Sequence, residues 1–157
     1  MPSQIEPEYI CATGEQAGPN WGSTSVEYLE GQLRNMEAAL DILDGNYDAT
    51  DLARWDIELD DDHRPDDAQE ALYSAHEGQV LDAWRTEVRG LDGELRHLES
   101  VTLLLAFGGP HVELVVEEQQ VRLVRRWWNE RSDAVTRSVE HCEIANRYLE
   151  AFYMVGS

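Results

Sequence analysis

VTLLLAFGGPHVELVV, residues 101–116, contains two apolar runs on either side of a Gly-Gly-Pro turn. Both runs are rich in valine and leucine and have the length of strands, and glycine adopts the positive φ of a tight turn at low cost. A third run, Val121–Trp128, follows a polar turn and places Val121, Leu123 and Arg125 on one face. Three antiparallel strands in a meander are therefore predicted for this part of the chain.

A helix is predicted N-terminal to the meander, from Thr24 to Gly45. Thr24 and Glu27 have the spacing of a capping box, in which each side chain bonds the other residue's backbone N–H. Apolar residues then recur every three or four positions, the period of one helical face. These residues are Val26, Leu29, Leu33, Met36, Leu40 and Leu43.

Two further helices are expected. One begins at Pro65 or Asp66, where proline and acidic side chains suit a helix N-terminus, and its pattern continues through Leu72 and onward to Trp84. The other covers Val139–Met154, whose aromatic and aliphatic residues recur at helical spacing and would pack across the sheet. The stretch with Leu91, Leu95 and Leu98 also has helical spacing, interrupted by Gly90 and Gly93.

These elements predict an α+β fold: N-terminal helices, a small antiparallel β-meander and a C-terminal helix. Residues 1–22 contain three prolines and three glycines without an apolar period and are expected to form an arm or loop. Residues 23–157 are expected to form a single α+β domain. Its acidic helical part is 23–100, and its sheet and C-terminal helix are 101–157.

The charge of the chain is strongly negative and unevenly distributed. The 157 residues include 32 Asp and Glu, 12 arginines and no lysine, for a net charge of −20. Residues 1–100 hold 24 of the acids and 6 of the arginines, whereas residues 101–157 hold 8 and 6. A field of this kind favours a partner with a basic surface.

Candidate partner-binding residues come from two acidic groups in the helical part. The denser group lies between residues 48 and 67, anchored by Leu52, Trp55, Ile57 and Leu59, and is expected to be irregular and exposed to solvent. The second group lies on the polar face of the first helix. Together they are Asp48, Asp51, Asp56, Glu58, Asp60, Asp61, Asp62, Asp66, Asp67, Glu30, Glu37, Asp41 and Asp44.

No motif for catalysis or for a cofactor is present in the sequence. The Asp60-Asp61-Asp62-His63 run lacks the alternating acids, central glycine and distal glutamate of an EF-hand, so no metal site is predicted. Cys11 and Cys142 have no zinc or redox spacing. There is no Gly-x-Ser-x-Gly, no His-Glu-x-x-His and no P-loop. A non-enzymatic protein without cofactors is expected, and a metal-dependent enzyme centred on Asp60–Asp67 is the least favoured alternative.

Three segments resemble a group of small acidic proteins of bacterial plasmids, integrative elements and phages. They are Leu103–Leu114, the pair Trp127-Trp128 and Asn146–Met154, so the resemblance covers about the last third of the chain. It implies a strand, a Gly-Gly-Pro turn, a second strand, an aromatic-rich third strand and a final helix. It also implies a mobile-element context, in which acidic inhibitors of host restriction or CRISPR machinery occur.

The function expected is inhibition by mimicry of nucleic-acid charge. Carboxylates would occupy the basic surface of a DNA-binding defence complex, such as a CRISPR effector or a restriction system. The chain itself would not bind nucleic acid or membranes, and a homodimer is an open possibility. No signal segment or membrane span is seen in the sequence, which leads us to expect a cytoplasmic protein of the host cell. The alternative is an accessory protein of a salt-adapted organism, in which acidity serves solubility alone.

Overall fold

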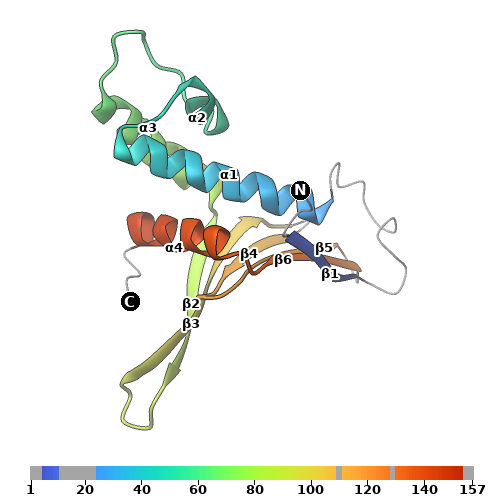
Figure 1. Cartoon of the computed structure of the whole chain (residues 1–157). Helices are drawn as coiled ribbons and strands as arrows, with labels where there is room; N and C mark the ends of the chain where they lie inside the picture. The colour runs from blue at the N-terminus through green and yellow to red at the C-terminus, as the bar shows by residue number, and fades with distance from the viewer. Residues whose placement is uncertain (1–4, 11–23, 109–110, 128–129, 154–157) are drawn as a thin grey trace.

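The computed structural model describes residues 5–10, 24–108, 111–127 and 130–153, and its architecture is α+β. Six antiparallel strands form one sheet, and helices cover one of its faces (Figure 1). The elements in chain order are β1 (Ile5–Ile10), α1 (Ser25–Asp44), α2 (Ala49–Arg54), α3 (Pro65–Gln79), β2 (Asp82–Arg89), β3 (Leu95–Ala106), β4 (His111–Val116), β5 (Val121–Trp127), β6 (Glu130–Thr136) and α4 (Val139–Tyr153).

The sheet has the order β1-β6-β5-β4-β3-β2, so the predicted meander β3-β4-β5 lies at its centre. Register places Leu103, Leu114, Leu123 and Ala134 side by side across four strands, and all four are buried. Such a cross-strand row is how side-chain pairs stabilise a sheet. Residues 5–10, expected within an N-terminal arm, form the edge strand β1 and pair with β6.

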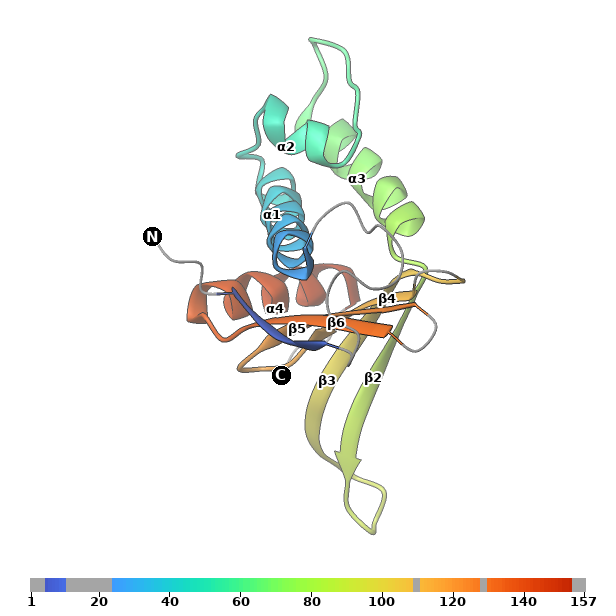
Figure 2. The same ribbon diagram turned by 90° about the vertical axis from the view of Figure 1, so that its right-hand side faces the viewer.

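Helices α1 and α4 supply the other half of the core. Helix α1 begins at the predicted Thr24–Glu27 capping box and ends at Gly45, whose φ of 80° is the left-handed C-cap conformation that glycine favours. Its buried face, which includes Leu29, Leu33 and Met36, packs with α4 above the sheet (Figure 1). Helices α2 and α3 pack against α1 and lie beyond the sheet (Figure 2).

Three expectations for the helical part are wrong. Residues 49–54 of the acidic block form helix α2, because Asp48 and Asp51 build a capping box at its start. Helix α3 ends at Gln79, and Trp84 lies in strand β2. Residues 95–98, with their helical leucine spacing, belong to strand β3, because they pair with β2.

Strands β2 and β3 form an arm that extends beyond the rest of the sheet (Figures 1 and 2). Residues 101–104 of β3 pair with both β2 and β4, whereas the residues of 95–100 that pair do so with β2 alone. The turn at the tip carries Leu91, which is fully exposed. Within the ranges that the structure describes, no helix has the length and apolar character needed to cross a membrane.

Candidate functional site

The charge of the chain is concentrated in the part that contains α1, α2 and α3, which we call the helical layer and which does not include α4. Residues 24–80, which contain α1, α2 and α3, carry 16 Asp and Glu and 3 Arg, a net charge of −13. Residues 81–157, which contain five of the strands and α4, carry 13 acids and 9 Arg, a net charge of −4. The helical layer and the sheet therefore differ in charge as well as in architecture.

Within this layer the structure brings together acidic residues from different elements. Glu37, Asp41 and Asp44 lie on α1, and Asp48 and Asp51 lie at the start of α2. Partial burial raises the pKa of the Asp41 carboxyl, and the negative charges of Asp51, Glu37, Asp44 and Asp48 raise it further. A negative charge raises the pKa of another carboxyl in this way only when the two lie close together, so these four acids lie near Asp41 and form one cluster with it.

A second group of carboxylates follows α2 in the chain. The segment from residue 56 to the first turn of α3 carries exposed acidic side chains, which include Asp56, Glu58, Asp60, Asp61, Asp62 and Asp66. The exposure expected for this segment is therefore confirmed. We call the thirteen predicted acids, from the cluster and this segment together with Glu30 and Asp67, the acidic helical surface.

The loop that carries these acids is held in place by contacts with its neighbours. Trp55 and Ile57 are buried, as expected, and the Trp55 indole N–H donates to the Asn35 carbonyl oxygen at 2.8 Å. The His63 ring stacks on Tyr47, and its Nε2 lies 2.8 Å from the Tyr47 hydroxyl. The exposed carboxylates therefore sit on an ordered support.

Several of the predicted acids also serve the local structure, a role that sequence reasoning did not assign. Asp48 accepts from the Asp51 N–H at 2.9 Å, and Asp51 accepts from the Asp48 N–H at 3.2 Å. Asp67 accepts from the Arg64 N–H at 3.0 Å at the start of α3. The Asp-x-x-Asp spacing of Asp48 and Asp51 before a helix is a signal that could have revealed the first of these caps.

Few of these carboxylates are neutralised by arginine. Glu30 pairs with Arg34 one helical turn later, and Asp44 lies 3.7 Å from Arg147 of α4. For the other eleven acids of the surface, the described part of the chain provides no ion pair within 4 Å. The acidic helical surface thus keeps most of its charge.

Three arginines of the sheet interact with residues outside the acidic helical surface. Arg122 and Arg131 lie 3.4 Å and 2.7 Å from the buried carboxylate of Asp133. The Arg125 side chain is buried, as the alternation in its strand predicts, and donates from Nε to the Ser25 hydroxyl at 3.0 Å. Its guanidinium also lies over the Tyr28 ring, 5.7 Å from the centroid. These arginines stabilise the sheet and its contact with α1 rather than the acidic helical surface.

A shallow cavity of about 420 Å³ adjoins the acidic helical surface at α2. Apolar side chains and carboxylates alternate around it. Its lining residues are Ala49, Leu52, Ala53, Asp56, Ile57, Glu58 and Leu59. An aliphatic stem with a cationic end, as in arginine, fits such a lining chemically.

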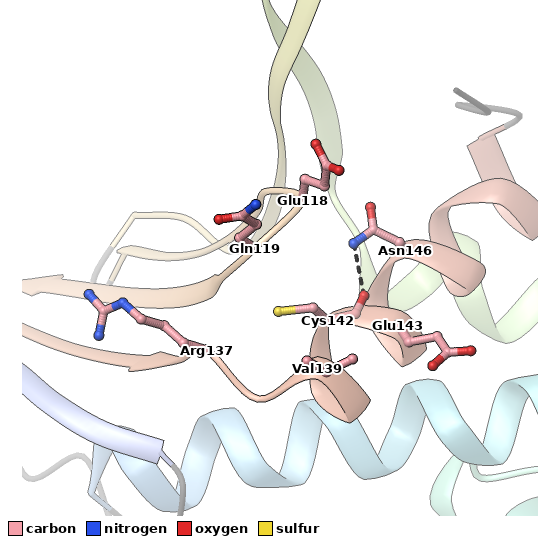
Figure 3. Close-up of a pocket in the computed structure, with 7 residues that line it drawn as sticks. All are labelled: Glu118, Gln119, Arg137, Val139, Cys142, Glu143 and Asn146. Carbon is pink, nitrogen blue, oxygen red and sulfur yellow. Dashed lines mark hydrogen bonds between the residues drawn. The ribbon is translucent and has the colours of Figure 1, made fainter.

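A second cavity, of about 650 Å³, lies between the β4–β5 turn and the start of α4 (Figure 3). Figure 3 shows the Cys142 sulfur directed into the space between Gln119 and Arg137. Burial raises the pKa of this thiol, which keeps it protonated and unreactive at neutral pH. The Asn146 amide donates to the Cys142 carbonyl oxygen at 2.8 Å, a contact that fixes the helix rather than a substrate.

The described ranges contain no group of three or more His, Cys, Asp or Glu side chains arranged to hold a metal ion. The residues from Asp60 to His63 therefore do not form such a group. The Asp60 carbonyl oxygen lies 2.6 Å from His63 Nδ1, so one ring nitrogen of the histidine is occupied within its own turn.

Comparisons with protein families, with curated proteins and with solved structures give no match for this chain. The resemblance of its last third to proteins of mobile elements stays a prediction.

Proposed function

We propose that the chain is a non-enzymatic inhibitor whose acidic helical surface occupies the DNA-binding surface of a host defence complex. The target class is a CRISPR effector or a restriction system, in which lysine and arginine contact phosphate. Mimicry of nucleic-acid charge would then exclude DNA by direct competition. The observation that carries this proposal is a cluster of five carboxylates from two helices, of which only Asp44 has an arginine within 4 Å in the described part of the chain.

The spacing of the carboxylates supports mimicry. Glu30, Glu37, Asp41 and Asp44 lie within fifteen residues of α1, and the fourteen steps from the first to the last cover about 21 Å of helix axis at 1.5 Å per residue. That is one charge per ~5 Å, against one per ~1.7 Å for both strands of duplex DNA. Helix α1 alone therefore supplies about a third of the density, and α2 and the following loop add to it.

The cost of this arrangement also supports a partner. The Asp41 carboxyl, whose pKa is raised by burial and by the charges of its neighbours, destabilises the folded chain when it is ionised. Arginines in the same positions would remove the repulsion. A surface that keeps repelling charges together is suited to binding cations supplied by another molecule.

The cavity beside α2 gives a partner side chain a place to bind. An arginine whose stem lies on Leu52 and Leu59 would bring its guanidinium to Asp56 or Glu58 at the rim. Arginine is among the residues that contribute most to protein interfaces, and bidentate pairing with carboxylate is its strongest mode. This contact would add specificity to the long-range attraction.

The test is DNA binding by purified restriction and CRISPR complexes in the presence of the chain. The variant D60K/D61K/D62K, which changes three exposed loop residues, should lose most of its inhibition while its circular dichroism stays unchanged. Its matched control is E118K/E140K/E143K, which makes the same change in net charge on three exposed residues outside the helical layer. The control should inhibit as the unmodified chain does.

Equal loss in both triple variants would show that net charge alone matters and would contradict a defined surface. Inhibition should also weaken as salt rises, because the paired charges are screened. A chain that unfolds in dilute buffer and refolds at molar salt would instead support salt adaptation. Tight stoichiometric binding of a divalent cation in calorimetry would support an enzyme.

A further inference from the structure

Strand β2 ends the sheet and carries apolar side chains into solvent. Trp84 is 41% exposed, and Leu81, just before the strand, is 56% exposed. The strand packs mainly against β3, and no helix covers the arm that the two strands form (Figure 2). A two-stranded ribbon outside the main sheet is marginally stable by itself in water.

The two edges of the sheet differ in how far they allow another strand to pair. The β1 edge contains Pro7, which lacks a backbone N–H, and an irregular register between Pro7 and Tyr9. In the β2–β3 pair both irregularities add their extra residue to β3, so β2 itself runs without interruption. Proline and bulges are common protections of an edge, and β2 has neither.

The sequence of β2 is complementary to itself in the antiparallel direction. A two-fold axis at Thr86 places each Thr86 opposite its counterpart and each Arg85 opposite the other copy's Glu87. Opposite charges in directly paired positions stabilise a sheet. One axis therefore produces two Arg–Glu pairs.

Glu87 lies between two arginines of its own strand. Its carboxylate contacts the Arg85 and Arg89 guanidinium groups at 2.8 Å and 2.6 Å, and its side chain is 14% exposed. Oε1 is the oxygen in the 2.8 Å contact with Arg85, although that contact does not have hydrogen-bond geometry. In a dimer the Arg85 guanidinium of the other copy would add a second cation to this carboxylate.

From these observations we infer that β2 pairs with β2 of a second copy of this chain. The two sheets join into one continuous antiparallel sheet, and the interface uses the same patch on both subunits. The helical layers of both copies then lie on the same side. This dimer is independent of the proposed function, since it uses none of the acidic helical surface.

The test is sedimentation velocity of the full chain over a range of concentrations and salt. The unmodified protein should dimerise, more strongly at moderate salt because screening reduces the repulsion between two chains of charge −20. R85E and E87R each turn both cross-strand pairs into like-charge pairs and should weaken the dimer about tenfold or more. An equimolar mixture of R85E and E87R should form a heterodimer, because every pair is again opposite in charge.

The double variant R85E/E87R should also dimerise, and E118R, a charge change in the β4–β5 turn, should leave the dimer intact. A monomeric unmodified chain at all concentrations would overturn the inference. So would dimers of R85E and E87R as strong as the original. A second measurement needs no variant: hydrogen exchange of the Asp82–Arg89 amides should quicken on dilution, and unchanged exchange would overturn the inference as well.

Discussion

Nε2 of His76 lies 2.8 Å from the hydroxyl oxygen of Tyr153, 77 residues later in the chain. Its other ring nitrogen is hydrogen-bonded to the Tyr148 hydroxyl, and Phe152 stacks on the ring with centroids 4.3 Å apart. A neutral imidazole has one donor and one acceptor, so it satisfies both phenols at once. His76 thereby joins α3 to α4.

We expect H76F to lower the free energy of unfolding by about 1–3 kcal/mol, because it leaves the buried Tyr148 hydroxyl without its partner. Urea denaturation monitored by tryptophan fluorescence measures this change. Y73F on the same helix is the control, because Tyr73 is 47% exposed, and it should shift stability by less than about 0.5 kcal/mol. Equal stability of H76F and the unmodified chain would contradict this role.

Acidification should destabilise the fold through the same residue. Burial lowers the pKa of His76 below its ordinary value of 6.5, so the unfolded chain binds the proton more readily. Stability therefore falls as pH drops below 6.5 toward the folded-state pKa. Urea midpoints between pH 7.5 and 5 should fall less in H76F than in the unmodified chain, and parallel curves would argue against this linkage.

Removing a carboxylate from the acidic helical surface should stabilise the folded chain. D41N removes a carboxylate whose pKa is raised by burial and by four neighbouring acids, so it should stabilise the fold by about 0.5 kcal/mol. That gain should become smaller at high salt, because salt screens the repulsion between the carboxylates but does not change the burial of Asp41. E118Q, in a turn outside the helical layer, should have no effect, and a destabilised D41N would show that the carboxylate is not repelled.

Two neighbouring arginines on opposite faces of β5 should differ sharply in how much each contributes to the stability of the fold. R125M removes a buried guanidinium that holds Ser25 and Tyr28 of α1, and we expect a loss of about 2 kcal/mol. R126M removes an exposed guanidinium and should change stability by less than about 0.5 kcal/mol. Thermal unfolding of both variants in parallel measures the difference, and similar melting temperatures would refute it.

Cys142 should react slowly while the chain is folded. Its thiol is buried and its pKa is raised, so both access and the thiolate fraction are reduced. In a C11S background, a thiol reagent at pH 8 should label the denatured chain at least about tenfold faster than the native chain. Comparable rates would place the sulfur at an accessible surface.

The sequence predicted the elements whose periodicity and caps agree. Helix α1 has both a capping box and a C-cap glycine around a regular apolar face, and its bounds were correct. The central strands were found because their buried positions alternate, as in β4. Strand β6 was missed because its sequence is polar, and it is stabilised by pairing with β5 and by the Arg122–Asp133–Arg131 contacts.

The outer arm shows why the remaining elements could not be predicted. Residues 91–98 have leucines at helical spacing, and the strand pairing that overrides this spacing depends on β2, which itself was expected to continue a helix. The exposure of the acidic helical surface could be predicted from its charge alone. The closeness of α1 and α2 acids, by contrast, depends on a turn after Gly45 that local sequence does not specify.

The strand order has a consequence for folding speed. The chain enters the sheet at one edge with β1, crosses to the opposite edge at β2 and returns strand by strand until β6 meets β1. Ile5 consequently pairs with Thr136 across almost the entire length of the polypeptide. Contacts so distant along the chain close slowly, so this protein should fold in milliseconds to seconds, with the docking of its first strand as the concluding event.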